Sequence, residues 1–360
     1  MPAPGKPWIT ANQVTVLRLV PMPLLSWMIY KGHATGNTSY LWWSLIAGVI
    51  IGCTDWVDGM LARKYGPTVL GGLLDPIADK VFIAFAYTPF ADRGGLVAWW
   101  AVALMFTREF FITALRSAYE QRDLTMKTSY IAKAKTWTQM QGIGVMLLFP
   151  LIATGWPESA HLFISRMLSV GIALPLVAML GLYLARKKVW LAALWMSLSF
   201  AGLLAVHLYD WKYDVWAVMI GVLGITWISG LDYIAVGWKQ LRGRGDFRRA
   251  DAVRLIGALS LPILAYAVLY YTDAPRWTIF TILAFELAVG GLDNLLSHHK
   301  VATKALAWGG RVLGVSVMLG AALLLPSLAV PFSIVAAAGS AGGVIAEFVR
   351  GKPYYINALD

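Results

Sequence analysis

The chain has 360 residues, of which 59% are hydrophobic and only 14% charged, and its mean hydropathy is +0.65. Soluble domains carry about a quarter charged residues, so this composition excludes an ordinary soluble enzyme and a disordered chain. The single cysteine, Cys53, excludes an intrachain disulfide and a cysteine metal cluster. A net charge of +11 would suit binding to nucleic acid, but the basic residues lie in short runs between apolar segments, which argues against such a partner.

In chain order, twelve apolar stretches are long enough to be membrane helices, each of which needs about 20 residues. They do not alternate apolar and polar residues as the strands of an outer-membrane barrel do. We therefore predict an all-α polytopic membrane protein with about 12 transmembrane helices and no cleavable signal peptide. The predicted spans are 14–31, 40–62, 76–92, 95–117, 133–154, 163–185, 189–208, 214–238, 252–271, 277–296, 304–326 and 328–348.

The loops between these spans alternate in charge. One set, which includes the basic linker 239–254, holds 21 of the Lys and Arg residues, and the opposite set holds 5. The positive-inside rule places the basic set in the cytoplasm. We therefore predict a bacterial-type cytoplasmic (inner) membrane protein with both termini in the cytoplasm and no nucleic-acid partner.

Four acids stand out because most spans contain none. Asp55 and Asp58 are three residues apart near the end of the second span, and Asp75 and Asp79 are four apart near the start of the third. Residues three or four apart share one face of a helix. The two pairs are therefore expected to meet at the cytoplasmic end of two adjacent antiparallel helices.

Carboxylates that lie so close together need compensating cations to stay ionised. Oxygen ligands without His or Cys suit Mg²⁺ or Mn²⁺, and two such ions would clamp a pyrophosphate. Small residues beside the acids, such as Gly59 and Gly71, would let a bulky ligand approach the backbone. The alternative is that the acids are interfacial and pair with Arg63, Lys64 and Lys80.

The run resembles the signature of the CDP-alcohol phosphotransferase family, D-x2-D-G-x2-A-R-x8-G-x3-D-x3-D. Seven residues separate Arg63 from Gly71, where the family usually has eight. The resemblance implies a six-helix core, two Mg²⁺ or Mn²⁺ ions, and displacement of CMP from a CDP-linked lipid by an alcohol. It implies metal ligation by Asp55, Asp58, Asp75 and Asp79, with Asp79 as the base, and a CDP site lined by Gly59, Ala62, Arg63 and Gly71.

Three further motifs are similar to the phosphatidylglycerophosphate synthase branch of this family. They are Asn12-x-x-Thr15-x-x-Arg18, then Arg108-Glu109 with Arg116, then Lys133-x-Lys135-Thr136-x-x-Gln139. In the last motif Ala132 replaces a glycine that the branch shows before the first lysine.

These motifs favour glycerol 3-phosphate as the acceptor, because its phosphate needs cationic partners. We expect Arg108, Arg116, Lys133 and Lys135 to bind that phosphate, and CDP-diacylglycerol to be the donor. Inositol phosphate, serine or another alcohol stays open as the acceptor. A homodimer also stays open as the oligomeric state. A lipid or ion transporter or scramblase is the alternative from another class, although its charged site would be expected nearer the midplane.

The resemblance is strong over residues 8–145 and then lapses. The run 228–233, with Ser229 and Tyr233, resembles the sixth core helix, so that residues 160–210 form a two-helix insertion. We predict a catalytic membrane domain over 1–249. Residues 250–360 match no pattern that we can name, and we expect a separate four-helix membrane domain outside the chemical step. Its Gly and Ala residues favour helix–helix packing, and we expect it to support assembly or lipid handling. The basic linker 239–254 would hold anionic head groups of membrane lipids.

Overall fold

The structure, a computed structural model, describes residues 9–66, 68–124, 130–244, 247–300 and 307–356. Within these ranges the chain forms helices and turns and no strand, which confirms the all-α prediction. The helices are α1 (Ala11–Leu19), α2 (Met22–Thr35), α3 (Thr38–Tyr65), α4 (Val69–Tyr87), η1 (Thr88–Ala91), α5 (Trp99–Glu120), α6 (Tyr130–Gly155), α7 (Ala160–Arg186), α8 (Leu191–Asp210), η2 (Trp211–Tyr213), α9 (Asp214–Arg244), α10 (Arg249–Tyr271), α11 (Arg276–His298), α12 (Ala307–Leu324), η3 (Pro326–Leu328) and α13 (Ala329–Tyr355).

Several helices are long and apolar enough to cross a membrane, as expected for an integral membrane protein. In the described part these seven stretches are Thr38–Tyr65, Ala134–Gly155, Ala160–Arg186, Leu191–Leu231, Arg249–Tyr271, Arg276–His298 and Pro326–Tyr355. Helices α4 and α5 are not among them because both carry several charged residues. Charges inside membrane helices are rare and mark functional sites. The count of twelve spans stays a prediction.

The first predicted span, 14–31, consists of two helices. Helix α1 begins with a capping box, in which the Thr10 hydroxyl accepts from the Gln13 amide and the Gln13 side chain accepts from the Thr10 amide. Helix α2 begins after Pro21 and has Pro23 in its first turn. Proline has no amide hydrogen to donate, so the helix breaks between Leu19 and Met22. As a result, α1 packs separately against α3 and α4.

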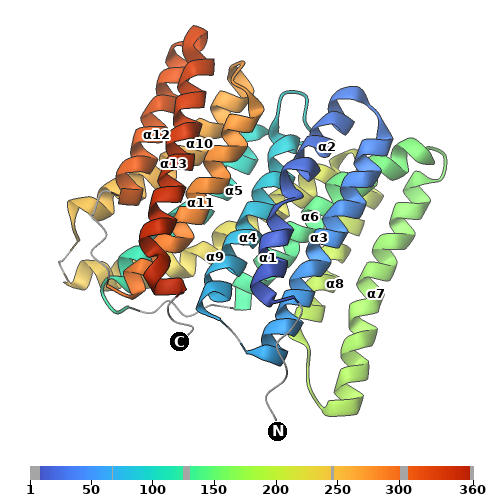
Figure 1. Ribbon diagram of the computed structural model, residues 1–360. Coiled ribbons are helices and arrows are strands. Elements are labelled where there is room, and N and C mark those ends of the chain that lie inside the picture. Colours follow the sequence, from blue (N-terminus) through green and yellow to red (C-terminus); the bar gives the residue numbers. More distant parts are fainter. Residues whose placement is uncertain (1–8, 67, 125–129, 245–246, 301–306, 357–360) are drawn as a thin grey trace.

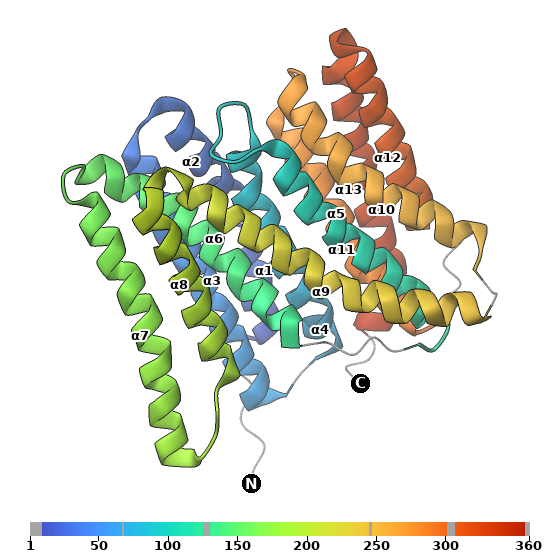
Figure 2. The same cartoon turned by 180° about the vertical axis from the view of Figure 1, so that it is seen from behind.

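Helices α4 and α5 lie in the middle of the bundle (Figures 1 and 2). Most side chains of α5 are buried, and Phe106 and Phe110 are fully enclosed. Helix α9 packs against α5 and α6, as expected of a sixth core helix, whereas α7 packs mainly on α8 at one edge of the molecule. This arrangement supports the predicted insertion over residues 160–210, which stays a prediction.

Helices α10 to α13 lie on the opposite side from α7 (Figure 1). Helix α10 packs along α5, and α11 packs against both α4 and α5, while α12 and α13 pack on α10 and α11. The C-terminal helices therefore share a large interface with α4 and α5, which each carry charged residues within the bundle. Helix α1 begins and α13 ends at the same end of the bundle.

Candidate active site

The four aspartates of the signature lie on two adjacent helices, with Asp55 and Asp58 on α3 and Asp75 and Asp79 on α4. The Thr15 hydroxyl of α1 lies 3.2 Å from Asp58 Oδ2 and 3.0 Å from Asp75 Oδ1, so it joins the two pairs. Asp58 is buried, whereas the side chain of Asp55 is 56% exposed. We call these four residues the carboxylate cluster.

Arg18 of α1 is the cation that the cluster shares. Its Nη1 lies 2.7 Å from Asp55 Oδ1 and 3.3 Å from Asp79 Oδ1, and its Nη2 lies 3.9 Å from Asp58 Oδ2. The guanidinium is buried, and its Nε and Nη2 have no hydrogen-bond partner in the described part of the chain. One guanidinium therefore offsets part of the charge of three acids and is held by ion pairs more than by hydrogen bonds.

Asn12 fixes the start of α4. Its Oδ1 accepts a hydrogen bond from Thr68 Oγ1 at 2.8 Å, and that hydroxyl accepts from the Gly71 amide at 2.9 Å. A Cβ on Gly71 would lie 2.9 Å from Asn12 Oδ1, which is too close. Thr15 and Arg18 therefore contact the acids directly, and Asn12 stabilises the start of the helix that carries Asp75 and Asp79.

The residues predicted to line the CDP site follow the acids on the same helix. Gly59, Ala62 and Arg63 belong to α3, and Arg63 is exposed. The Arg63 guanidinium folds back over Gly59, where an added Cβ would lie 3.4 Å from its Nη1. A flexible, exposed guanidinium beside the acids is suited to meeting a phosphate. Their role in binding CDP stays a prediction.

The donor chemistry of the cluster fits the predicted divalent ions. Carboxylates with a neighbouring hydroxyl and no His or Cys are the ligand types that Mg²⁺ and Mn²⁺ prefer. In the described residues, however, no three His, Cys, Asp or Glu side chains are already arranged as metal ligands. Arg18 lies among the acids instead, so metal binding requires the carboxylates to turn away from it.

A second site lies next to the cluster, between α4, α5, α6 and α9. It is a cavity of about 350 Å³, which we call the basic cavity. It is lined by Pro76, Lys80, Arg108, Glu109, Ile112, Thr113, Arg116, Lys135, Thr136 and Tyr233. It therefore gathers four cationic side chains and one carboxylate. Three predicted phosphate ligands, Arg108, Arg116 and Lys135, are among them.

Glu109 orients two of these cations. Its Oε1 accepts from Lys135 Nζ at 2.6 Å and from Arg108 Nη1 at 3.2 Å. Arg108 also donates to the Ser229 hydroxyl at 2.8 Å. Arg116, in contrast, makes no hydrogen bond or ion pair with any described residue and faces the cavity. Its guanidinium is therefore available to bind an anion.

A smaller cavity of about 160 Å³ connects the two regions. Asp79 lines it together with Lys80, Glu109, Lys135, Thr136 and Gln139. The Gln139 amide Nε2 is buried without a hydrogen-bond partner in the described part. Asp79 therefore contacts the other acids of the carboxylate cluster through their shared partner Arg18, and it faces the basic residues across this small cavity.

Sequence reasoning missed several residues of the basic cavity. Lys80 was interpreted only as a partner for the acids, yet its Nζ donates to Thr113 Oγ1 at 2.6 Å and lines both cavities. The signal was present, because a lysine inside a membrane span is unusual. Ser229 and Tyr233 belong to the run 228–233, which was identified from the sequence as part of the sixth core helix without a predicted site role for either residue. Lys133 belongs to α6, and its side chain lies outside the described part of the chain.

The described part of the chain is all-helical, has helices of membrane-spanning length and sets a group of acids beside a basic cavity. The CDP-alcohol phosphatidyltransferase family matches residues 8–236, and the chain belongs to this family. The match begins before α1 and reaches into α9, so it includes both sites. The chain is thus an enzyme of a phosphotransferase family.

Three similar proteins have names that describe an activity within this family. A probable phosphatidylglycerophosphate synthase of Mycobacterium tuberculosis is 35% identical over 179 residues, which cover 49% of this chain and 80% of that protein. The CDP-diacylglycerol–glycerol-3-phosphate 3-phosphatidyltransferase of Escherichia coli K12 is 34% identical over 138 residues, 36% of this chain and 75% of that protein. Another M. tuberculosis relative, provisionally named a cardiolipin synthase, is 30% identical over 155 residues, 40% of this chain and 71% of that protein. No solved structure matches the chain significantly.

Proposed function

We propose that this protein transfers the phosphatidyl group of CDP-diacylglycerol to glycerol 3-phosphate, giving phosphatidylglycerophosphate and CMP. One observation carries the proposal. The consecutive residues Asp79 and Lys80 connect the carboxylate cluster to the basic cavity, because Asp79 pairs with Arg18 and lines the small cavity that Lys80 also lines. A donor held at the acids and an acceptor held at the cations would therefore meet at this point.

The acceptor side is built for a phosphate monoester. Arg108 and Lys135 are oriented by Glu109, and Arg116 is unpaired in the described part. Guanidinium groups bind phosphate in fork geometry, and ionised partners make the stronger hydrogen bonds. A phosphate held there would place the acceptor's free hydroxyl toward the small cavity and Asp79.

Asp79 is the proposed base. Its carboxylate takes the proton of the acceptor hydroxyl while that oxygen bonds to the phosphorus that bears the diacylglycerol. The bond from this phosphorus to the CMP oxygen breaks, and CMP leaves with the electron pair. Arg63, with the open backbone at Gly59, Ala62 and Gly71, holds the cytidine diphosphate.

Two Mg²⁺ or Mn²⁺ ions would be held by Asp55, Asp58, Asp75 and Asp79. When bound, such ions neutralise the charge of the pyrophosphate and of the departing CMP. Thr15 and Arg18 orient the carboxylates from α1. We further propose that this side faces the cytoplasm of an inner membrane, since the basic loops point there under the positive-inside rule. A homodimer stays a prediction.

CMP release by the purified protein with CDP-diacylglycerol and a panel of acceptors tests the proposal. Glycerol 3-phosphate should support the fastest release, and inositol phosphate, serine and phosphatidylglycerol should support little. Phosphatidylglycerol is included because one relative is provisionally named a cardiolipin synthase. Preferred use of another acceptor would reassign the substrate, and no CMP with any acceptor would favour the transporter alternative.

A further inference from the structure

A third cavity lies on the other side of α4, where the C-terminal helix α11 meets the core. Its volume is about 240 Å³, and we call it the α11 chamber. Lys80, Arg116 and Glu120 line it from the core, and Asn294 and His298 line it from α11. Lys80 and Arg116 also line the basic cavity, so the same two cations face both spaces.

Two glycines allow α11 to come this close. A Cβ on Gly291 would lie 2.6 Å from Cγ1 of Ile77 on α4, and one on Gly290 would lie 2.9 Å from Cγ2 of Thr113 on α5. Both distances are shorter than a carbon–carbon contact, which is optimal near 3.5–4.0 Å. Helix α11 is therefore seated directly on the two helices that carry the acceptor residues.

Polar side chains then fix the last turns of α11 against the end of α5. Ser117 donates to Asn294 Oδ1 at 2.7 Å, Gln121 donates to the Ser297 hydroxyl at 3.3 Å, and His298 Nδ1 lies 2.9 Å from Glu120 Oε2. These partners are the residues that follow Arg116 along α5. Because Asn294 accepts through Oδ1, its amide Nδ2 is its remaining donor for a ligand in the chamber.

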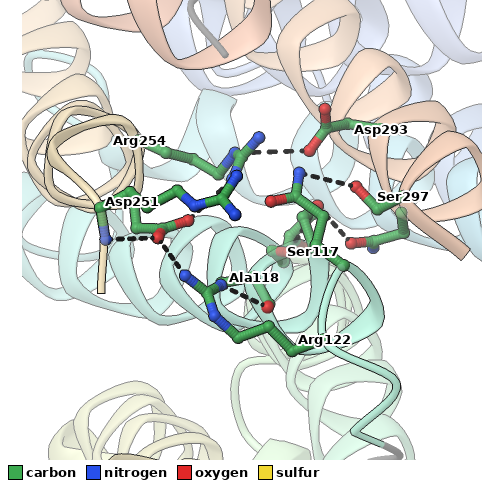
Figure 3. A network of polar contacts seen from close by, with 11 residues as sticks. Ser117, Ala118, Arg122, Asp251, Arg254, Asp293 and Ser297 are labelled. Carbon is green, nitrogen blue, oxygen red and sulfur yellow. Dashed lines mark hydrogen bonds and ion pairs between the residues drawn. The ribbon is translucent and has the colours of Figure 1, made fainter. Parts of the chain in front are cut away.

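A buried ionic network strengthens the same junction (Figure 3). Arg122, in the turn that follows α5, donates to Asp251 of α10 at 2.6 Å, and Arg254 Nε lies 3.4 Å from Asp293 Oδ2 on α11. Arg254 also lies 3.5 Å from Asp251 Oδ1 on its own helix, so the two ion pairs form one network that joins α10 to α11 and to the turn after α5. All four side chains are buried. Removing one partner of a buried pair is strongly destabilising, so α5, α10 and α11 are expected to move as one unit.

We infer that α11 completes the acceptor site: Arg108 and Lys135 hold the acceptor's phosphate from the basic cavity, and the groups of the α11 chamber reach the same phosphate from the other side of Lys80 and Arg116. The inference rests on the proposed function. Lys80 and Arg116 supply positive charge, and Asn294 and His298 supply hydrogen-bonding groups, with Glu120 holding the imidazole. This set suits the oxygens of a phosphate monoester. It argues against the sequence prediction that residues 250–360 stay apart from the chemistry.

The shared chemistry also suits the phosphate of an anionic lipid head group, so the experiment has to separate the two sources. We assign the chamber to the soluble acceptor because it shares its two cations with the cavity that leads to Asp79. A head group that bound there for anchoring would have no need of that connection.

The test is steady-state kinetics of full-length variants in vesicles of phosphatidylcholine, with and without phosphatidylglycerol. Asn294→Ala should raise the KM for glycerol 3-phosphate about 10-fold, the lower end of the effect of losing a hydrogen bond to a charged group. The kcat and the KM for CDP-diacylglycerol should change little. His298→Ala should have a smaller effect, because its side chain is 66% exposed. His299→Ala, at the next position and outside the chamber, is the matched control.

A second variant fills the chamber instead of removing a donor. Gly72 lines it, and an added Cβ there would meet nothing within 4 Å, so Gly72→Leu should fold and block the space. Gly320→Leu, at another open glycine on α12, is its control. Gly72→Leu should raise the acceptor KM, and Gly320→Leu should leave it unchanged.

Three results would overturn the assignment. An acceptor KM that is unchanged in Asn294→Ala and Gly72→Leu removes the chamber from the acceptor site. A KM increase seen only in vesicles with phosphatidylglycerol assigns the chamber to a lipid head group. Equal KM increases for both substrates, with a lower melting temperature, show a structural role. Failure of the wild-type protein to use glycerol 3-phosphate would instead overturn the proposed function.

Discussion

The carboxylate cluster and the basic cavity are built in opposite ways. The cluster comes from two helices joined by a short turn, with acids that are partly exposed, and it is covered by α1. The basic cavity is assembled from α4, α5, α6 and α9, its charged groups are largely buried, and α11 lies behind it. The cluster can therefore bind ions from the surrounding water, whereas the cavity has to be shaped by packing.

The difference also shows in how each region balances charge. In the cluster a single buried guanidinium, that of Arg18, forms ion pairs with three acids and compensates only part of their negative charge. In the cavity a single carboxylate, Glu109, serves two of four cations. One region thus has an excess of negative charge and the other of positive charge. This contrast suits a donor bound through cations and an acceptor bound through its phosphate.

Removal of divalent cations should have the largest effect, and it should act only on the cluster. Activity should vanish in excess chelator and return with Mg²⁺ or Mn²⁺, because the pyrophosphate charge needs these ions. CMP release is the measurement. Full activity in excess chelator would break the contrast between the two regions, since the acids would then have no ion to bind.

The next largest effect should come from Asp79→Asn, at the junction of the two regions. Loss of a general base commonly lowers turnover by about 10²–10⁴-fold. Binding of CDP-diacylglycerol should be largely retained, because the other three acids remain. Asp210→Asn, at a partly exposed acid far along the chain that pairs with Lys212, is the control. Turnover near that of the wild type would show that another group takes the proton.

Arg116→Ala should sharpen the contrast from the acceptor side. Loss of a hydrogen bond between charged groups corresponds to about 1.5–3 kcal/mol, roughly 10- to 100-fold in KM for glycerol 3-phosphate. The KM for CDP-diacylglycerol should change less. Arg186→Ala, at an exposed residue at the end of α7, controls for net charge. An unchanged acceptor KM would place the phosphate elsewhere.

Arg18→Gln should have the smallest effect, on stability. Breaking a buried ion pair costs about 3–5 kcal/mol, but Asp55 and Asp79 are about half exposed and solvent screens them. We therefore expect a loss of about 1–3 kcal/mol in chelator, seen as a lower melting temperature. Added Mg²⁺ should stabilise the variant more than the wild type. Equal stabilisation of both would show that Arg18 and the ion do not share the acids.

The carboxylate cluster could be predicted from the sequence because its information is local. Asp55 and Asp58, and Asp75 and Asp79, are each spaced to share a helix face, and only one turn separates the pairs. Arg108, Arg116 and Lys135 could also be found, since charged residues inside apolar spans are conspicuous. All three line one cavity, and their predicted role in binding the acceptor phosphate stays a prediction.

The rest depends on contacts between distant segments. Nothing local marks Asn294 or His298 as neighbours of Arg116, because they follow it by more than 170 residues and only helix packing brings them together. Lys80 was considered from the sequence only as a possible partner for the four acids, and its place in the basic cavity depends on the packing of α5 and α6. Pro21 and Pro23 are present in the sequence, but the single span predicted over 14–31 did not take account of them. The structure shows the consequence of the break: α1 packs over the acids, and Thr15 and Arg18 contact them.

The proposed phosphatidyl transfer is tested most directly by following the acceptor molecule into the lipid product. Purified protein should be given CDP-diacylglycerol and deuterium-labelled glycerol 3-phosphate, and the lipid product and CMP should be measured together by mass spectrometry. If the proposed transfer is correct, labelled phosphatidylglycerophosphate and CMP form in equal amounts, and Asp79→Asn forms only traces of either product. CMP release without label in the lipid fraction, or label in the lipid without CMP, would contradict it.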